Sequence, residues 1–317
     1  MLQYLTAGES HGEALLGILN GLPAGLGIDN KRIDQELRRR QKGYGRGPRM
    51  KIEKDRIEIV CGTRKRKTLG SPIGLLIKNK DFSIEELPRV TRARGGHADL
   101  AGVLKYGFSD VRDVLERASA RETAMRVAIG AICRIFLEEF KIGISSVVVS
   151  IAGKTRVKDI HAVIDKAGGK GDTVGGVFEV CAKGVLPGLG SYTQSTQRLD
   201  ACLASALMSI PGVKGVEIGL GFGYADRLGS TVHDAIYYSE TKGLPGGRQG
   251  YWRKTNNAGG IEGGLSNGED ILLRACLKPI STLKRPLDSV DILTRKSAKA
   301  AVERSDVCVV EAAGVVG

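Results

Sequence analysis

The 317-residue sequence has no apolar run that approaches the roughly 20 residues of a membrane-spanning helix. Its six cysteines are widely scattered and form no C-x-x-C pair. This cysteine usage favours reduced thiols in the cytoplasm over a disulfide framework or a zinc site, so we expect no bound metal. Because no apolar run is long enough to span a bilayer, we also expect no membrane association. A motif that begins at Gly8 leaves little room after Met1, and we expect no signal or transit peptide.

Aromatic residues are also scarce, at 5% of the chain, which argues against a base-stacking surface for nucleic acid. Positive charge is abundant, since 48 Lys and Arg against 35 Asp and Glu give +13. Such an excess attracts nucleic acid or small phosphorylated ligands. The cations gather at 38–51, 64–67 and 89–94, which favours a phosphate site. For Arg64–Lys67 we prefer a solvated hairpin turn. An RNA-binding protein is the alternative function, but no RNA-binding motif is present.

Nucleotide-binding fingerprints are absent as well. The glycines of Gly219–Gly223 lack the G-x-G-x-x-G spacing at the start of a helix, and no P-loop occurs. Hairpins mixed with helices favour an α+β fold over a doubly wound parallel sheet. With 42% hydrophobic residues and no linker, we expect a single domain.

The hydrophobic periodicity predicts where helices and strands lie. A helix begins at Asp29 or Asn30, buries Ile33 and Leu37, and ends at Arg38–Arg40. The other predicted elements are a hairpin of 56–59 with 73–77 closed through 70–72, a helical stretch over 109–140 interrupted at 117–122, strands at 147–151, 177–180 and 216–218, and helices at 157–166 and 195–208.

One local pattern occurs twice. Leu22–Gly27 and Leu186–Gly190 are similar Pro-Gly turns, each between a predicted strand and a predicted helix. Two such units indicate an internal duplication around one core. Chance recurrence of a common turn is the alternative.

Two of the four histidines lie in segments typical of catalytic loops. His11 stands between Ser10 and Gly12, and His97 stands between Gly96 and Ala98. A histidine among small residues can reach a ligand and exchange a proton with it. The other two, His161 and His233, lack that setting, and we expect them to be ordinary surface or core residues.

Three later segments also suit ligand binding. Five glycines between Gly259 and Gly268 leave backbone N–H groups open to an anionic or planar ligand, although a plain flexible loop is an equal alternative. The run Lys278-Pro279-Ile280-Ser281-Thr282 offers a cation and two hydroxyls for a phosphate. Asp306 is a candidate base, or else a capping carboxylate.

Together these motifs resemble the chorismate synthase family over nearly the whole chain. The segments that carry the resemblance are GESHG (8–12), RRRQKGYGRGPR (38–49), GHAD (96–99), ERASARETAM (116–125), NNAGGIEGG (256–264), KPIST (278–282) and RSDVC (304–308). The resemblance implies a β–α–β sandwich, two antiparallel sheets enclosing helices, assembled as a homotetramer. It also implies trans-1,4-elimination of phosphate from 5-enolpyruvylshikimate 3-phosphate to give chorismate, in the shikimate pathway. Reduced FMN is required without net redox change.

The resemblance also implies roles for particular residues. His11 gives a proton to the departing phosphate, His97 stabilises the reduced flavin at its N1/O2 edge, and Asp306 assists removal of the C6 proton through flavin N5. The implied substrate-binding residues are Ser10, Arg40, Arg46, Arg49 and Arg121, of which Arg40 and Arg46 also interact with NADPH. The implied flavin-binding residues are Arg117, Ala118, Ser119, Pro211, Gly212, Gly263, Lys278, Pro279, Ile280, Ser281, Thr282 and Arg304.

Two features depart from the family pattern. Gly95 stands where the family usually has a proline before Gly-His. The sequence ends at Gly317, where family members usually continue into a terminal helix, so we expect one domain, residues 1–317, without that helix. A flavin protein of this family that has lost activity is therefore a third interpretation, which a catalytic assay separates from the lyase.

Overall fold

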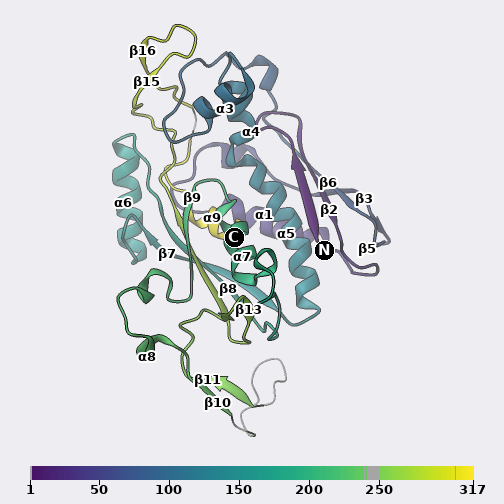
Figure 1. The fold of residues 1–317 in the computed structure, drawn as a ribbon. Coiled ribbons are helices and arrows are strands. Elements are labelled where there is room, and N and C mark those ends of the chain that lie inside the picture. Colours follow the sequence, from purple (N-terminus) through teal and green to yellow (C-terminus); the bar gives the residue numbers. More distant parts are fainter. Residues whose placement is uncertain (1, 239, 241–249, 304) are drawn as a thin grey trace.

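The computed structural model describes residues 2–238, 240, 250–303 and 305–317. They include two four-stranded antiparallel sheets (Figure 1). The first has the order β1 (Gln3–Ala7), β2 (Ala14–Asn20), β6 (Ile73–Lys78), β3 (Glu58–Cys61), and the second the order β7 (Gly143–Ile151), β8 (Gly176–Lys183), β14 (Ile271–Leu277), β9 (Val213–Ile218). Two-stranded hairpins are β4 (Thr63–Arg64) with β5 (Lys67–Thr68), β10 (Ile236–Tyr238) with β11 (Tyr251–Arg253), β12 (Ile261–Glu262) with β13 (Leu265–Ser266), and β15 (Asp288–Val290) with β16 (Ser297–Lys299).

Helices lie between and around the sheets (Figure 1). The α-helices are α1 (Asn30–Gln41), α2 (Arg49–Ile52), α3 (Asp99–Tyr106), α4 (Arg112–Ala118), α5 (Thr123–Glu138), α6 (Val157–Gly169), α7 (Leu199–Met208), α8 (Gly229–Val232) and α9 (Val310–Val316). Single 3₁₀ turns are η1 (Ile84–Glu86), η2 (Ala120–Glu122), η3 (Ser195–Gln197) and η4 (Gly221–Tyr224). Within the described ranges, no helix combines the length and the apolar character needed to cross a bilayer.

Helices α1, α5 and α9 occupy the space between the two sheets (Figure 1). α5 packs against β1, β2 and β6, α9 packs against β7 and β8, and α1 contacts both helices. The first half of α5 is buried on nearly every side, as expected of a central helix. Antiparallel sheets mixed with helices confirm the predicted α+β class.

Helix α1 follows the predicted pattern closely. The Asp29 side chain accepts a hydrogen bond from the Lys31 backbone N–H at 3.1 Å and so caps the first turn. Ile33 and Leu37 are fully buried against the first sheet and α5. The basic residues of the last turn are favourable there because the helix dipole is negative at that end. One of them, Arg40, is buried and reaches the site described below.

The predicted hairpin of 56–59 with 73–77 exists as β3 and β6, but its chain reversal differs from the expectation. The tight turn lies at Lys65 and Arg66, whose φ angles are +50° and +63°, between β4 and β5. Positive φ at both central residues is the geometry of a type I′ turn. The hairpin turn at Arg64–Lys67 is thus confirmed, whereas Gly70-Ser71-Pro72 only leads the chain into β6.

Ser119 breaks the helical stretch predicted over residues 109–140. Its backbone is extended, with φ −65° and ψ 142°, between α4 and η2. Its hydroxyl accepts a hydrogen bond from the Arg121 backbone N–H at 3.3 Å and caps the short turn before α5. The break matters because it places residues 118–121 along the wall of a cavity.

The two sheets have the same order relative to the sequence. In each, the last strand along the chain lies between the second and the third. In each, the second strand leads through a Pro-Gly turn, at Leu22–Gly27 or Leu186–Gly190, toward a helix, α1 or α7.

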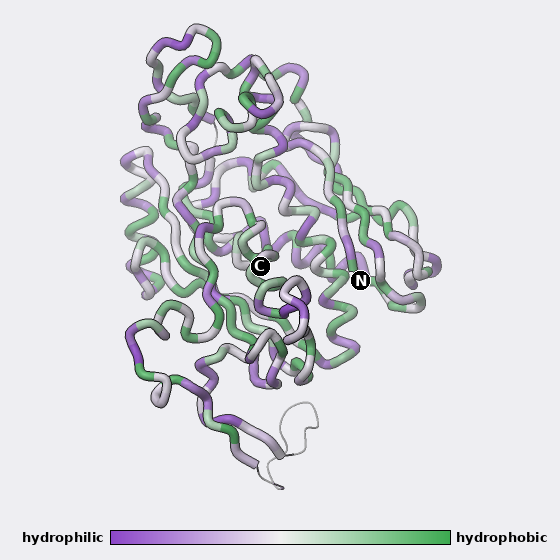
Figure 2. Tube along the Cα trace, viewed as in Figure 1, coloured by the Kyte–Doolittle hydropathy of each residue, from purple (hydrophilic) through white to green (hydrophobic). Residues whose placement is uncertain are grey.

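The outer faces of the sheets differ in chemistry. Apolar positions run along the strands of both sheets (Figure 2), but the first sheet leaves several of them uncovered. Leu5 and Ile18 are cross-strand neighbours and are 69% and 50% exposed, with Leu16 beside them at 49%. The second sheet carries on its outer face an ion-paired row in which Arg274 lies 3.2 Å from Glu179 and 3.9 Å from Glu217.

Candidate active site

A cavity of about 460 Å³ collects side chains from both halves of the chain. His11, His97 and Asp306 all line it, so the two histidines share one cavity, as predicted. The other predicted site residues along its wall are Ser10, Arg40, Arg46, Arg49, Ala118, Ser119, Arg121, Pro211, Gly212, Lys278, Pro279, Ile280, Ser281 and Thr282. Its apolar wall includes Met50, Leu115, Leu277 and Val309.

Three predicted flavin-binding residues are not placed at this wall. Arg117 is exposed and donates hydrogen bonds to the carbonyl oxygens of Thr6 at 2.9 Å and Gly8 at 3.1 Å, so it fastens the end of β1. Gly263 is exposed in the β12–β13 turn. Arg304 lies outside the described residues.

Contacts within the protein hold the glycine-rich segment at 256–264 in place. The carboxylate of Asp234 accepts hydrogen bonds from the backbone N–H groups of Asn257 and Ala258, at 2.9 and 2.8 Å. Gly259 packs directly on Gly219, where an added Cβ would lie 2.0 Å from the carbonyl oxygen of Asn257. Close backbone packing therefore explains Gly259 and Gly260, whereas an added Cβ on Gly263 would meet nothing within 4 Å, so ligand binding at this segment stays a prediction.

A buried carboxylate holds the ring of His11. Nδ1 lies 2.9 Å from Glu116 Oε2 and 3.1 Å from Oε1, and the His11 backbone N–H donates to Oε2 at 2.9 Å. Arg112 pairs with the same carboxylate at 3.2 Å. Burial by itself would raise the pKa of Glu116, but the hydrogen bonds from His11 and Arg112 outweigh it, and the pKa falls below its ordinary value.

A second buried carboxylate holds the ring of His97. Nδ1 lies 2.5 Å from Asp99 Oδ1, and Arg94 grips the same carboxylate with two hydrogen bonds, of 2.8 and 3.0 Å. Burial would raise the pKa of Asp99, yet these bonds hold it far below its usual range. The Nε2 atom of His97 has no hydrogen-bond partner among the residues that the structure describes, so it is available to a ligand.

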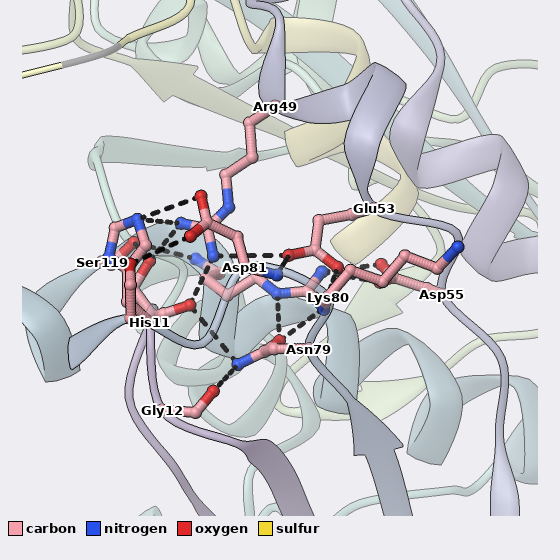
Figure 3. A network of polar contacts seen from close by, with 12 residues as sticks. His11, Gly12, Arg49, Glu53, Asp55, Asn79, Lys80, Asp81 and Ser119 are labelled. Carbon is pink, nitrogen blue, oxygen red and sulfur yellow. Dashed lines mark hydrogen bonds and ion pairs between the residues drawn. The ribbon is translucent and has the colours of Figure 1, made fainter. Parts of the chain in front are cut away.

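Buried acids also support the arginines. Arg121 lies 2.7 Å from Asp55 Oδ1 and donates two hydrogen bonds to Asn79 Oδ1, at 2.9 and 2.7 Å. Asn79 in turn points toward Gly12 and donates to its carbonyl oxygen at 2.6 Å (Figure 3). Arg49 lies 3.6 Å from Glu53 and donates to the Ser10 hydroxyl at 2.6 Å. The network fixes the His11 loop and the arginines relative to one another.

Three arginines at the cavity keep unused hydrogen-bond donors. Arg40 is buried, and burial lowers its pKa to about 10, although Asp55 lies 3.8 Å away. Its Nη1 and Nε of Arg49 are buried without a hydrogen-bond partner, and Nε of Arg46, also without one, has an ion pair with Asp306. An orphaned guanidinium N–H is costly unless a ligand pairs with it. These atoms therefore indicate an anion-binding site.

Asp306 joins the loop after α1 to the end of the chain. One carboxylate oxygen accepts a hydrogen bond from the Gly47 backbone N–H, and the other lies 3.2 Å from Nε of Arg46. The same loop is held at Tyr44, whose ring stacks on His161 with centroids 3.9 Å apart and whose hydroxyl donates to Asp165 at 2.8 Å. His161 therefore has a structural contact at the loop that carries Arg46.

The family model for chorismate synthase matches residues 2–317. The chorismate synthase of Caldanaerobacter subterraneus subsp. tengcongensis is 54% identical over 318 residues, which cover 99% of this chain and 89% of that protein. The chorismate synthase of Geobacter sulfurreducens is 51% identical, with coverage of 100% and 90%. This chain belongs to the chorismate synthase family. A crystal structure of chorismate synthase is similar to it, with a TM-score of 0.79 at 42% identity over 99% of this chain and 87% of that one.

As a member of the chorismate synthase family, the chain is a carbon–oxygen lyase. Sequence reasoning did not single out the acids behind its site. Glu53 and Glu116 also have an arginine four residues earlier, but the contacts that matter to the site, with Arg121 and His11, are distant in the sequence, as is the contact of Asp55 with Arg121. Asp99 could have been recognised, because it follows His97 by two residues at the start of α3, where a carboxylate is favourable.

The segment before His97 explains a departure from the chorismate synthase pattern. The His97 backbone N–H donates to the Arg94 carbonyl at 3.4 Å, and Gly96 has a φ of +77°. A left-handed residue at the third position is the mark of a type II turn, in which proline is favoured at the second position. Gly95 occupies that second position, and an added Cβ would meet nothing within 4 Å.

We therefore expect Gly95→Pro to stabilise this member of the chorismate synthase family by about 0.4–1 kcal/mol, because it restricts the unfolded chain without straining the turn. The measurement is the free energy of unfolding from urea titration. The neighbouring change Gly96→Ala is the matched control and should destabilise, because a side chain at positive φ is strained. A loss of stability in Gly95→Pro would show that the turn is not of type II.

Proposed function

We propose that the cavity binds 5-enolpyruvylshikimate 3-phosphate and eliminates its phosphate to form chorismate, with reduced FMN as the cofactor. The observation that carries the proposal is the set of buried guanidinium N–H groups on Arg40, Arg46 and Arg49 that lack a hydrogen-bond partner; of these, Nε of Arg46 has an ion pair with Asp306 at 3.2 Å and Nη1 of Arg40 a longer one with Asp55 at 3.8 Å. The substrate is a phosphate ester that also bears carboxylates, and the planar fork of arginine matches both groups. An RNA-binding role gains no support, because these arginines line a cavity and not an open surface.

The residues present fit a flavin phosphate. Lys278 lines the cavity and donates to the Gly96 carbonyl at 2.8 Å. Burial lowers the pKa of Lys278, and the charge of Lys214 adds to the effect, so an anion at this wall would relieve a concentration of positive charge. The apolar residues Leu115 and Leu277 suit a planar ring. When bound, reduced FMN supplies electron density that eases phosphate loss. We propose Ala118, Ser119, Pro211, Gly212 and Lys278–Thr282 as its contacts.

The three candidate catalytic groups divide the proton chemistry. His11, beside Arg49 and Ser10, gives a proton to the departing phosphate, whose charge the arginines neutralise. His97, with its free Nε2, stabilises charge on the flavin. Asp306 assists removal of the C6 hydrogen. Arg40 and Arg46 also contact NADPH, should the protein reduce its own flavin. The six free thiols in the described structure suit the reducing cytoplasm that we propose as its location.

The decisive experiment is an anaerobic assay of the 317-residue chain with dithionite-reduced FMN and 5-enolpyruvylshikimate 3-phosphate. We expect chorismate, detected by its absorbance, and phosphate in equal amounts. NADPH in place of dithionite tests intrinsic flavin reduction. Flavin binding without product would favour the interpretation of a family member that has lost activity.

A matched pair of substitutions tests the role of Asp306. Asp306→Asn removes the base but keeps an oxygen that can accept the Gly47 N–H, so we expect kcat to fall by about 10²-fold with FMN affinity retained. Asp306→Ala should lose FMN affinity as well, because the loop loses its anchor. Kinetics and flavin fluorescence titration measure both effects. Equal loss of flavin affinity in the two variants would make Asp306 structural.

We also propose that the chain is a single domain, residues 1–317, built as a duplicated β–α–β sandwich and assembled as a homotetramer. The shared strand order of the two sheets supports the duplication. The uncovered apolar face around Leu5, Leu16 and Ile18 supports the assembly, because monomers rarely expose such a sheet face.

Placing charge on that face should therefore dissociate the assembly. For Leu5→Asp with Ile18→Asp we expect a smaller particle in sedimentation velocity, because two carboxylates cannot be buried there unpaired. Leu104→Asp on α3, where the side chain is 74% exposed, is the control and should sediment like the parent chain. An unchanged assembly in the double variant would remove this face from the interface.

A further inference from the structure

We propose that Glu116 positions His11 as the proton donor. Its carboxylate fixes the proton on Nδ1, so that the opposite ring nitrogen, Nε2, carries the exchangeable proton into the cavity. This inference rests on the proposed function of the cavity and adds to it a residue that sequence reasoning did not single out. Glu116 lies behind the ring and not at the cavity wall, so it acts through His11.

The geometry leaves the ring little freedom. Both carboxylate oxygens lie within 3.1 Å of Nδ1, and Oε2 also accepts the His11 backbone N–H. The backbone is tied a second time, because the Ser10 N–H donates to the Glu116 carbonyl oxygen at 2.9 Å. Main chain and side chain of the histidine are thus held by one residue of α4. A carboxylate can only accept, so Nδ1 must carry a hydrogen.

The carboxylate is itself held in its ionised form. It is buried, and Arg112 approaches Oε1 at 3.2 Å while pairing with Glu303 at 3.1 Å. The depressed pKa of Glu116 agrees with this geometry. An ionised acceptor behind the imidazole favours the cationic ring, as the buried carboxylate of a catalytic triad does.

The other charged groups that face His11 lie on its cavity side. Arg49 Nη1 is 3.2 Å from Nε2, on α2, and Asp81 Oδ2 is 3.9 Å from Nε2, in the segment after β6. With Nδ1 protonated, Nε2 accepts from Arg49 in this structure. A phosphate in the cavity offers Arg49 a charged acceptor in its place. Nε2 can then take a proton, with Glu116 and Asp81 both favouring the cation.

In the proposed step, His11 supplies one proton to the leaving phosphate. The Nε2 proton moves to a phosphate oxygen as the C–O bond breaks, and the bonding electrons leave with the phosphate. The ring returns to the neutral form with hydrogen on Nδ1, and solvent restores the proton on Nε2. Glu116 stays ionised throughout and never exchanges a proton with the substrate.

The test is Glu116→Gln in the full chain. The amide has nearly the same shape, and Glu303 still compensates Arg112, so we expect a folded protein with normal flavin affinity. Removing the charge disfavours the imidazolium, so kcat at pH 7 should fall by about 10²-fold. The fall of kcat at alkaline pH should also begin about one pH unit lower. His11 can donate only while its ring is protonated, and without the Glu116 charge the protonated ring is less favoured. Glu138→Gln, at the exposed Arg32–Glu138 pair, is the matched control and should leave both unchanged.

A readout independent of turnover separates this inference from the proposed function. The ¹⁵N shifts of His11 should show hydrogen on Nδ1 in the parent chain and a shift toward the Nε2–H tautomer in Glu116→Gln. Absence of chorismate from the parent chain would overturn the proposed function whatever the tautomer. An unchanged tautomer and an unshifted pH profile in Glu116→Gln, even with lower kcat, would make Glu116 structural and overturn the inference. Should Glu116→Gln fail to fold, Glu116→Asp, with its charge kept, should retain the parent pH profile, and an acid-shifted profile would contradict the proposal.

Discussion

Repulsion among clustered cations is the constraint on which this site depends. Arg40, Arg49 and Arg121 converge on one cavity, and each is buried or half-buried, where repulsion is screened least. Asp55 and Glu53 lie behind them and compensate part of the charge. The compensation is incomplete, since Nη1 of Arg40 and Nε of Arg49 are buried without a hydrogen-bond partner. A cavity built in this way is stable without a ligand and still strongly attracts an anion.

The same arrangement is repeated at the two histidines. Glu116 behind His11 and Asp99 behind His97 each bind Nδ1, and each carboxylate is also paired with an arginine, Arg112 or Arg94. The difference lies on the cavity side. Nε2 of His11 faces Arg49, whereas Nε2 of His97 meets no hydrogen-bond partner within the described ranges. The first ring is therefore coupled to anion binding, while the second is set to meet a ligand directly, as the proposed flavin role requires.

Sequence patterns correctly predicted the features that depend on interactions between residues close together in the chain. The cap at Asp29, the buried stripe of α1 and the turn at Arg64–Lys67 depend on neighbours a few residues apart, and all were found. The loops with His11 and His97 were found because histidine between small residues is unusual. The interruption predicted at 117–122 is also confirmed, since small and charged residues replace the apolar stripe there and the Ser119 hydroxyl caps the next turn.

What the sequence could not supply is the pairing of distant charges. His11 and Glu116 are 105 residues apart in the sequence, and no sequence pattern near either residue predicts their contact. Gly259 is a second example, because its close packing is against Gly219, which comes from elsewhere in the chain. Chemistry at this cavity therefore depends on two kinds of residue. Many of those proposed to meet the ligand lie in recognisable loops. Those that set the charge and orientation of the first kind lie behind them, with Glu116 on α4, Asp99 at the start of α3, and Glu53 and Asp55 just after α2. A change in the second kind should alter the pH dependence of the reaction before it alters binding, which is how the two can be told apart.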